Sequence, residues 1–176
     1  AERRPRKHLT LVHKTNVLVH AGHLWKRTVD KVAEEFPEIA VDYLHVDAAT
    51  IFLVTDPARF DVVVTDNLFG DILTDLAAAV TGGIGLAASG NINPDQGGVS
   101  MFEPMGGSAP KYTGQNVINP IAAIGAMGML LEHNGQPAAA ARIMKAIQQV
   151  TGTKMKSQAA GKMGFGTREV GDLVVG

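Results

Sequence analysis

The sequence contains no cysteine and is poor in aromatic residues, with one tryptophan and two tyrosines among 176 residues. The lack of cysteine excludes disulfides, thiolate zinc sites, iron–sulfur ligation and cysteine nucleophiles. The most apolar stretch, residues 120–131, is too short to cross a bilayer, and the basic segment 1–8 lacks the apolar run of a signal peptide. These absences favour a cytoplasmic protein.

Neither sign of charge is in excess. The chain has 16 lysine and arginine residues against 17 aspartate and glutamate residues, for a net charge of -1. This balance provides no basic surface for nucleic acid or an anionic membrane, and we expect neither as a partner. Apolar residues make up 45% of the chain, enough to build a hydrophobic core.

The first half of the chain alternates between predicted strands and helices. Apolar runs predict strands at 9–12, 39–46 and 60–65, and helices at 21–36, 48–54 and 71–80. The β-branched run 62–64 is typical of a strand that is covered on both faces. The alternation predicts an α/β fold with a mostly parallel sheet and helices on both faces.

The second half has a different character. Residues 82–114 are rich in glycine and proline, with one short strand expected at 100–103. Helices are expected at 120–133 and 137–150, while the pattern of 167–175 fits a strand or a helix. The glycine pair 82–83 marks the expected boundary between two units, 1–81 and 82–176.

Aspartates provide the first candidate site. Asp71 and Asp75 lie four residues apart at the start of a predicted helix, so their carboxylates point to the same side. They either bind a cation or interact favourably with the helix dipole. Asp47 and Asp66 follow predicted strands, where α/β sheets gather ligand-binding residues, and Asp47 is also a candidate helix cap. An all-oxygen set of this kind suits Mg²⁺ or Mn²⁺.

Lys14 provides a second candidate, because it follows the first predicted strand at a polar corner. It either faces solvent or serves acid–base chemistry in a ligand cleft. Asn16 is a site residue or the cap of the next helix. The histidines show no metal-ligand spacing, and surface or capping roles are expected for all of them: His8, His13, His20, His23, His45 and His133.

Four segments, in order, resemble the β-decarboxylating dehydrogenases of the isocitrate/isopropylmalate family, and its isopropylmalate branch most of all. HKTNVL, at 13–18, is similar to the catalytic-lysine segment. HVDAATIFLVTDPARFDVVVTDN, at 45–67, resembles the segment of the first metal aspartate. VVVTDNLFGDILTDLAAAVTGGIGLAAS, at 62–89, resembles the metal-site segment, and FEPMGGSAPKYTGQNVINP, at 102–120, the adenosine-binding loop. The resemblance spans nearly the whole chain.

The resemblance implies oxidation of a 2-hydroxy acid by a nicotinamide cofactor, followed by decarboxylation with Mg²⁺ or Mn²⁺. For isopropylmalate this is a step of leucine biosynthesis. It further implies that Asp71 and Asp75 ligate the metal, with Asp47 reaching across from the partner subunit of a homodimer. Lys14, also from the partner, would help to remove the hydroxyl proton of the substrate. Asn16 would lie near the substrate and nicotinamide.

The resemblance places cofactor binding on one loop. The residues expected to contact the cofactor there are Glu103, Gly107, Ser108, Ala109, Pro110, Lys111, Tyr112 and Asn119. Gly106 stands where isopropylmalate enzymes usually have histidine, and Lys111–Tyr112 replaces their acidic and aliphatic pair. That lysine–tyrosine pair instead resembles the one with which bacterial isocitrate dehydrogenases hold the 2′-phosphate of NADP. NAD is expected, with NADP as the alternative.

The family's chains are longer, so this one looks like a C-terminal half. Residues 1–81 would be part of the small substrate, metal and dimerisation domain, and 82–176 the C-terminal part of the cofactor domain. Determinants of the substrate side group would lie upstream of residue 1. Isocitrate, homoisocitrate, tartrate and malate enzymes therefore stay open, as does a non-catalytic module for dimerisation and metal binding.

Overall fold

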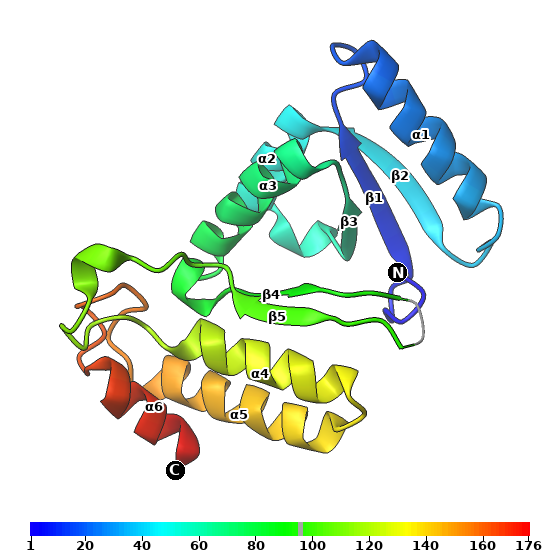
Figure 1. Ribbon diagram of the computed structural model, residues 1–176. Coiled ribbons are helices and arrows are strands. Elements are labelled where there is room, and N and C mark those ends of the chain that lie inside the picture. The colour runs from blue at the N-terminus through cyan, green and yellow to red at the C-terminus, as the bar shows by residue number, and fades with distance from the viewer. Residues whose placement is uncertain (95–96) are drawn as a thin grey trace. The chain divides into compact units, whose positions relative to one another are not determined.

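The computed structural model describes residues 1–94 and 97–176 (Figure 1). The chain divides into two compact units, Ala1–Val80 and Thr81–Gly176, each with a cluster of buried apolar residues. Over the described ranges, no helix combines the length and apolar content needed to cross a membrane. The substrate, metal and cofactor roles expected of the two segments stay predictions.

The first unit is a parallel α/β layer. Its elements are β1 (His8–His13), α1 (Val19–Ala33), β2 (Ala40–His45), α2 (Val46–Thr55), η1 (Pro57–Arg59), β3 (Val62–Val64) and α3 (Asn67–Val80). The strand order is β2-β1-β3 and both pairings are parallel, with β1 in the middle (Figure 1). The predicted α/β fold with a parallel sheet is confirmed.

Helices cover both faces of β1. Val12 packs with Ala49 of α2 and Leu73 of α3. Its neighbour His13 points to the opposite face, as successive strand residues do, and lies against Trp25 of α1. α1 connects β1 to β2, and α2 connects β2 to β3, so the two connections run across the sheet in opposite directions. Because crossovers between parallel strands are right-handed, these two helices lie on opposite faces of the sheet.

β3 departs from expectation. The run of three valines predicted a strand covered on both faces, but Val63 is 38% exposed. The described ladder pairs β3 with β1 alone, so β3 lies at an edge of the sheet. A β-branched run indicates a strand; it does not reveal whether both faces of that strand are covered.

Three helix ends differ from prediction. α3 begins at Asn67 rather than Asp71, because Asp66 Oδ1 accepts a hydrogen bond from the Phe69 backbone N–H at 2.9 Å and caps the helix. α2 begins at Val46, so Asp47 lies inside its first turn and is not its cap. α1 ends at Ala33, before the expected stop at residue 37, and its N-cap position is Leu18, so Asn16 is not the cap either.

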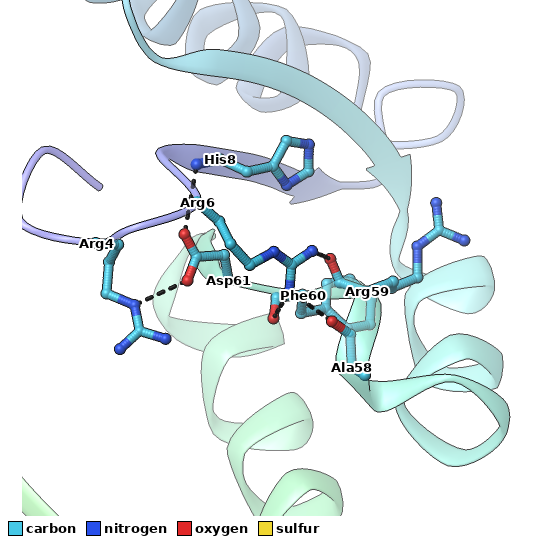
Figure 2. Close-up of polar contacts among 7 residues, drawn as sticks. All are labelled: Arg4, Arg6, His8, Ala58, Arg59, Phe60 and Asp61. Atoms are coloured by element: carbon cyan, nitrogen blue, oxygen red, sulfur yellow. Dashed lines mark hydrogen bonds and ion pairs between the residues drawn. The ribbon is translucent and has the colours of Figure 1, made fainter.

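The basic N-terminal segment is anchored to the stretch that precedes β3 (Figure 2). The Arg6 guanidinium donates to the carbonyl oxygens of Ala58 at 2.6 Å and Arg59 at 2.8 Å. Arg4 Nε lies 2.8 Å from Oδ1 of Asp61, whose side chain is fully covered. These contacts use the terminal arginines within the protein itself.

The second unit combines a hairpin with helices. Its elements are η2 (Ile84–Leu86), β4 (Ala88–Asn91), β5 (Met101–Pro104), η3 (Pro110–Tyr112), α4 (Ile121–His133), α5 (Pro137–Thr153) and α6 (Thr167–Val175). β4 and β5 pair antiparallel, and α4 packs against the hairpin and against α5 (Figure 1). The core of the unit gathers Ile121, Ile147, Met163 and Val170.

Strand β4 was not predicted from the sequence. Its four residues, Ala-Ser-Gly-Asn, carry no β-branched or aromatic side chain. Gly90 is needed because a Cβ there would lie 2.9 Å from Cδ1 of Phe102 on β5. The segment over 167–175 resolves as helix α6, whose buried Val170 joins the core and whose Glu169 carboxylate accepts the Gly166 N–H at 2.7 Å.

Candidate active site

Lys14 and Asp47 meet at the carboxyl edge of the parallel sheet. Lys14 follows β1 and Asp47 follows β2, and the pairing of His13 with His45 brings the two strand ends level. Lys14 Nζ lies 2.8 Å from Asp47 Oδ2. The hydrogen bond from this ammonium holds the pKa of Asp47 below its ordinary value. This ion pair joins one candidate catalytic residue to one candidate metal ligand.

The ion pair borders a largely apolar depression of about 460 Å³. The lining residues are Lys14, Val17, Leu18, Val46, Asp47, Thr50, Leu68 and Phe69. Asn16 is exposed and lies outside this lining. A small organic acid would find one cation, one carboxylate and an apolar wall there.

Asp71 and Asp75 lie one turn apart on α3 and are both exposed. Because α3 begins at Asn67, its first turn contains no acidic residue, and the helix-dipole explanation for this pair is weakened. No group of three or more potential metal ligands forms among the residues that the structure describes. Asp47 is thus not gathered with Asp71 and Asp75 within one chain.

His13 contradicts the surface role expected of the histidines. Its side chain is 0% exposed, with the ring centroid 5.4 Å from that of Phe69 and 6.2 Å from that of Trp25. Nε2 lies 3.1 Å from Asp66 Oδ2, although neither ring nitrogen of His13 forms a hydrogen bond with a described residue. The burial follows from the position of His13, the last residue of the central strand and on the same face as buried Leu11.

Sequence reasoning missed Tyr43. Its hydroxyl lies within hydrogen-bonding distance of His13, Thr15 and His45, and therefore contacts the residues on both sides of Lys14. No motif marks this residue. Only the parallel register, which pairs Tyr43 with Leu11, brings its ring to the end of β1.

In the second unit, residues of the predicted cofactor loop line two cavities. Gly107, Ala109, Tyr112 and Asn119 line one of about 650 Å³, together with residues 82–85 and 157–160. Ser108, Ala109 and Tyr112 line another of about 600 Å³, together with Thr167 and Arg168 at the start of α6. Glu103, Pro110 and Lys111 stand outside both linings.

Three loop residues have individual features. Ala109 has φ 44°, the left-handed conformation that few non-glycine residues adopt, directly before η3. Lys111 Nζ lies 4.8 Å from the centroid of the Tyr112 ring. Asn119 is buried; it donates to the Gln158 carbonyl at 3.0 Å and accepts from the Ile121 N–H at 3.0 Å. The amide of Asn119 thus shapes the cavity wall.

The profile of the isocitrate/isopropylmalate dehydrogenase family matches residues 1–174. The chain belongs to this family. The 3-isopropylmalate dehydrogenase of Beutenbergia cavernae is 72% identical to it over 148 residues, which are 84% of this chain and 43% of the relative. The 3-isopropylmalate dehydrogenase of Clavibacter michiganensis is 59% identical over 99% of this chain and 48% of the relative.

Solved structures agree on the fold. An isocitrate dehydrogenase from Methylococcus capsulatus matches with a TM-score of 0.87 at 40% identity, covering 96% of this chain and 49% of that one. A β-decarboxylating dehydrogenase from Thermococcus kodakarensis matches with a TM-score of 0.82 at 35% identity, over 95% of this chain and 48% of that one. The chain spans about half the length of the relatives it matches.

Proposed function

We propose that the protein carrying this chain is a cytoplasmic, metal-dependent, NAD(P)-linked dehydrogenase that oxidises and decarboxylates 3-isopropylmalate in leucine biosynthesis. The observation that carries the proposal is the Lys14–Asp47 ion pair at the carboxyl edge of the sheet, beside an apolar depression. The names of the relatives support the choice of substrate. Residues 1–80 would serve substrate, metal and dimerisation, and 81–176 the cofactor.

The donor set fits a hard divalent cation. Asp71 and Asp75 present two exposed carboxylates on one side of α3, and Asp47 provides a third. Since Asp47 is not gathered with the other two in one chain, it would join them from a second copy. When bound, Mg²⁺ or Mn²⁺ polarises the substrate hydroxyl and stabilises the negative charge that develops on decarboxylation.

We propose that Lys14 helps to remove the hydroxyl proton of the substrate: after its ammonium has passed one proton to Asp47 or to solvent, the neutral amine accepts the hydroxyl proton. Its side chain is only 23% exposed and its Nζ is fixed by Asp47, so the amine is held at one end of the depression. Asn16 would stand near the substrate and the nicotinamide. When bound, the cofactor supplies the hydride acceptor.

A homodimer fits the exposed apolar surface of α2 and α3, which pack together. Ile51, Val54, Leu68 and Ile72 are between 52% and 61% exposed. Apolar side chains gathered on one surface mark an interface or an aggregation hazard. Leu73, on the same helix as Leu68 and Ile72, is buried in the core of its own unit and does not belong to this exposed surface.

The cofactor would bind at the loop of the second unit, where Gly107, Ala109 and Tyr112 line the larger cavity. The backbone of this loop is open enough for the cofactor to approach closely, because a Cβ at Gly107 would meet no atom within 4 Å. NAD is our first choice. NADP is the alternative, because Lys111 places a cation beside Tyr112.

The test is turnover by the full-length protein. With Mn²⁺ and NAD or NADP, we expect 3-isopropylmalate to raise the absorbance of reduced nicotinamide and to release carbon dioxide. Isocitrate, homoisocitrate, tartrate and malate should be poorer substrates. Preference for one of those acids would indicate that the protein belongs to another branch of the family. If none of the acids is turned over, the alternative of a non-catalytic module for dimerisation and metal binding is favoured.

A further inference from the structure

We propose that Tyr43 is a positioning residue for Lys14: its hydroxyl binds the backbone on both sides of Lys14 and sets where the amine lies. The inference rests on the proposed function for the role of Lys14. Tyr43 itself touches neither Nζ nor the depression among the contacts described, so it would act through the backbone.

The hydroxyl of Tyr43 joins three residues. It donates to the His13 carbonyl at 3.1 Å and accepts from the Thr15 backbone N–H at 3.1 Å. Thr15 Oγ1 and His45 Nδ1 each lie 3.0 Å from it. A phenol hydroxyl donates one hydrogen and accepts up to two, so the two backbone hydrogen bonds leave room for one of these two side chains at a time. His13 and Thr15 are the two chain neighbours of Lys14.

The hydrogen bonds of the Tyr43 hydroxyl to His13 and Thr15, called the clamp below, lie where the regular pairing of β1 with β2 stops. β1 ends at His13, and the carbonyl of Lys14 accepts from the N–H groups of Val17 and Leu18 in a turn. A lysine side chain has a flexible stem of four carbons, so a fixed backbone is needed if the amine is to keep one position. The bond from the Thr15 N–H to Tyr43 keeps the segment attached to β2 for two further residues.

Two neighbouring elements hold the same segment from other sides. The His13 ring is packed between Trp25 and Phe69. α1 lies directly on Thr15, because a Cβ on Gly22 would be 2.7 Å from the Thr15 Cα. Tyr43, on β2, contacts the same segment from a third side. Its ring is itself set at 85° to that of His45, with centroids 5.2 Å apart.

A positioning role and a purely structural role predict different kinetics. If Tyr43 only stabilised the fold, Tyr43→Phe would lower the unfolding temperature and leave kcat unchanged while the protein stays folded. If Tyr43 positions Lys14, the loss of one oxygen displaces the amine, and displacements of about 1 Å cost up to about 100-fold in rate. We expect kcat to fall about 10- to 100-fold in Tyr43→Phe, with KM changed by less than about threefold.

The experiment uses the full-length protein and a matched set of variants. Thr15→Val removes the second hydroxyl of the clamp and should lower kcat, whereas Thr15→Ser keeps that hydroxyl and should restore it. Thr28→Val, at an exposed position of α1, is the control for the loss of a threonine hydroxyl. A kcat for Tyr43→Phe equal to that of the unaltered protein overturns the inference.

A second readout needs no turnover. The acylation rate of Lys14 by an amine-reactive ester, measured by mass spectrometry, should rise severalfold in Tyr43→Phe. Lys26, ion-paired with Asp30 at 2.6 Å, is the internal reference. If the unaltered protein turns over no hydroxy acid, the proposed function fails. The labelling experiment still tests the clamp, because it does not depend on turnover. Equal Lys14 labelling in both proteins overturns the clamp.

Discussion

At the scale of single residues, the proposed cofactor site predicts that the charge at position 111 affects cofactor choice. A carboxylate there would accept hydrogen bonds from the ribose hydroxyls of NAD and repel a 2′-phosphate, whereas a lysine would attract the phosphate. We therefore expect Lys111→Asp to shift preference toward NAD. Because Lys111 is exposed, a contribution of about 1 kcal/mol, or roughly tenfold, is the expected size.

The measurement is the ratio of kcat/KM for NADP over NAD in the full-length protein. Lys145→Asp, at an exposed position of α5, makes the same charge change away from the loop and should leave the ratio as it was. If Lys111→Asp leaves this ratio unchanged, the side chain of Lys111 points into solvent and does not contact the cofactor.

Another residue-scale prediction concerns the candidate metal ligands. Asp71→Asn removes one charge and one anionic oxygen from the pair on α3, so Mn²⁺ binding should weaken about tenfold or more. Calorimetric titration of the full-length protein measures this. Asp172→Asn, at an exposed position of α6, is the control and should bind as before. Equal affinity in Asp71→Asn would contradict the metal assignment.

Asp61 predicts a pH dependence of stability. Its hydrogen bond from Arg4, aided by the His8 N–H and the charges of Arg4 and Arg6, outweighs burial and lowers its pKa from the ordinary value of 3.8. A carboxyl with a lowered folded-state pKa contributes stability that is complete above the unfolded value and is lost as the pH falls through the folded value. The contribution of Asp61 is therefore present at neutral pH and is lost as the pH falls below the ordinary value of 3.8 toward the lowered folded-state value.

Asp61→Asn should accordingly lower the unfolding midpoint at pH 7 and converge with the unaltered protein as the pH falls below the ordinary aspartate range. Thermal unfolding followed by circular dichroism across this range measures the difference. Asp56→Asn, at an exposed position before η1, should run parallel to the unaltered protein. A difference between Asp61→Asn and the unaltered protein that does not depend on pH would remove the charge of Asp61 as its cause.

At the scale of elements, two helical glycines predict opposite effects. A Cβ at Gly22 of α1 would lie 2.7 Å from the Thr15 Cα and 3.1 Å from His13 Nδ1, so α1 could not keep its place. Gly22→Ala should therefore cost about 1–3 kcal/mol or more of unfolding free energy. At Gly171 of α6, a Cβ would meet no atom within 4 Å, and Gly171→Ala should add about 0.5–1 kcal/mol.

Urea unfolding of the two variants checks this pair. Each variant is the control for the other, since both add one methyl group to a helix. Stabilisation by Gly22→Ala would mean that α1 does not press on the segment after β1 as described.

At the scale of the whole molecule, the open question is whether two copies complete the site. We predict that Ile72→Lys, which places a charge in the exposed apolar surface of α2 and α3, yields a monomer with weakened Mn²⁺ binding. Sedimentation velocity and metal titration measure both effects. Val175→Lys, a similar change at an 89% exposed position of α6, should do neither. A variant Ile72→Lys that stays dimeric would place the interface elsewhere.

Much of this molecule was determined by its sequence alone. The alternation of apolar runs predicted the α/β order of the first unit, and α4 and α5 follow from their periodicity and from the prolines at 120 and 137. These features are local, because helices and buried strands each impose their own apolar period. The family resemblance was also readable from motifs that keep their order along the chain.

Other features were decided by tertiary structure. Asp66 caps α3 and Asp47 lies inside α2, because a cap depends on backbone angles rather than on residue type alone. The pairing of β4 with β5 leaves no room for a side chain at Gly90 beneath Phe102, and His13 is buried against Trp25 of α1 and Phe69 of α3. The pairing of Lys14 with Asp47 and the clamp by Tyr43 join residues about thirty positions apart. Only the parallel register of β1 and β2 brings them together, because no local pattern in either segment encodes which residue of the other strand it will face.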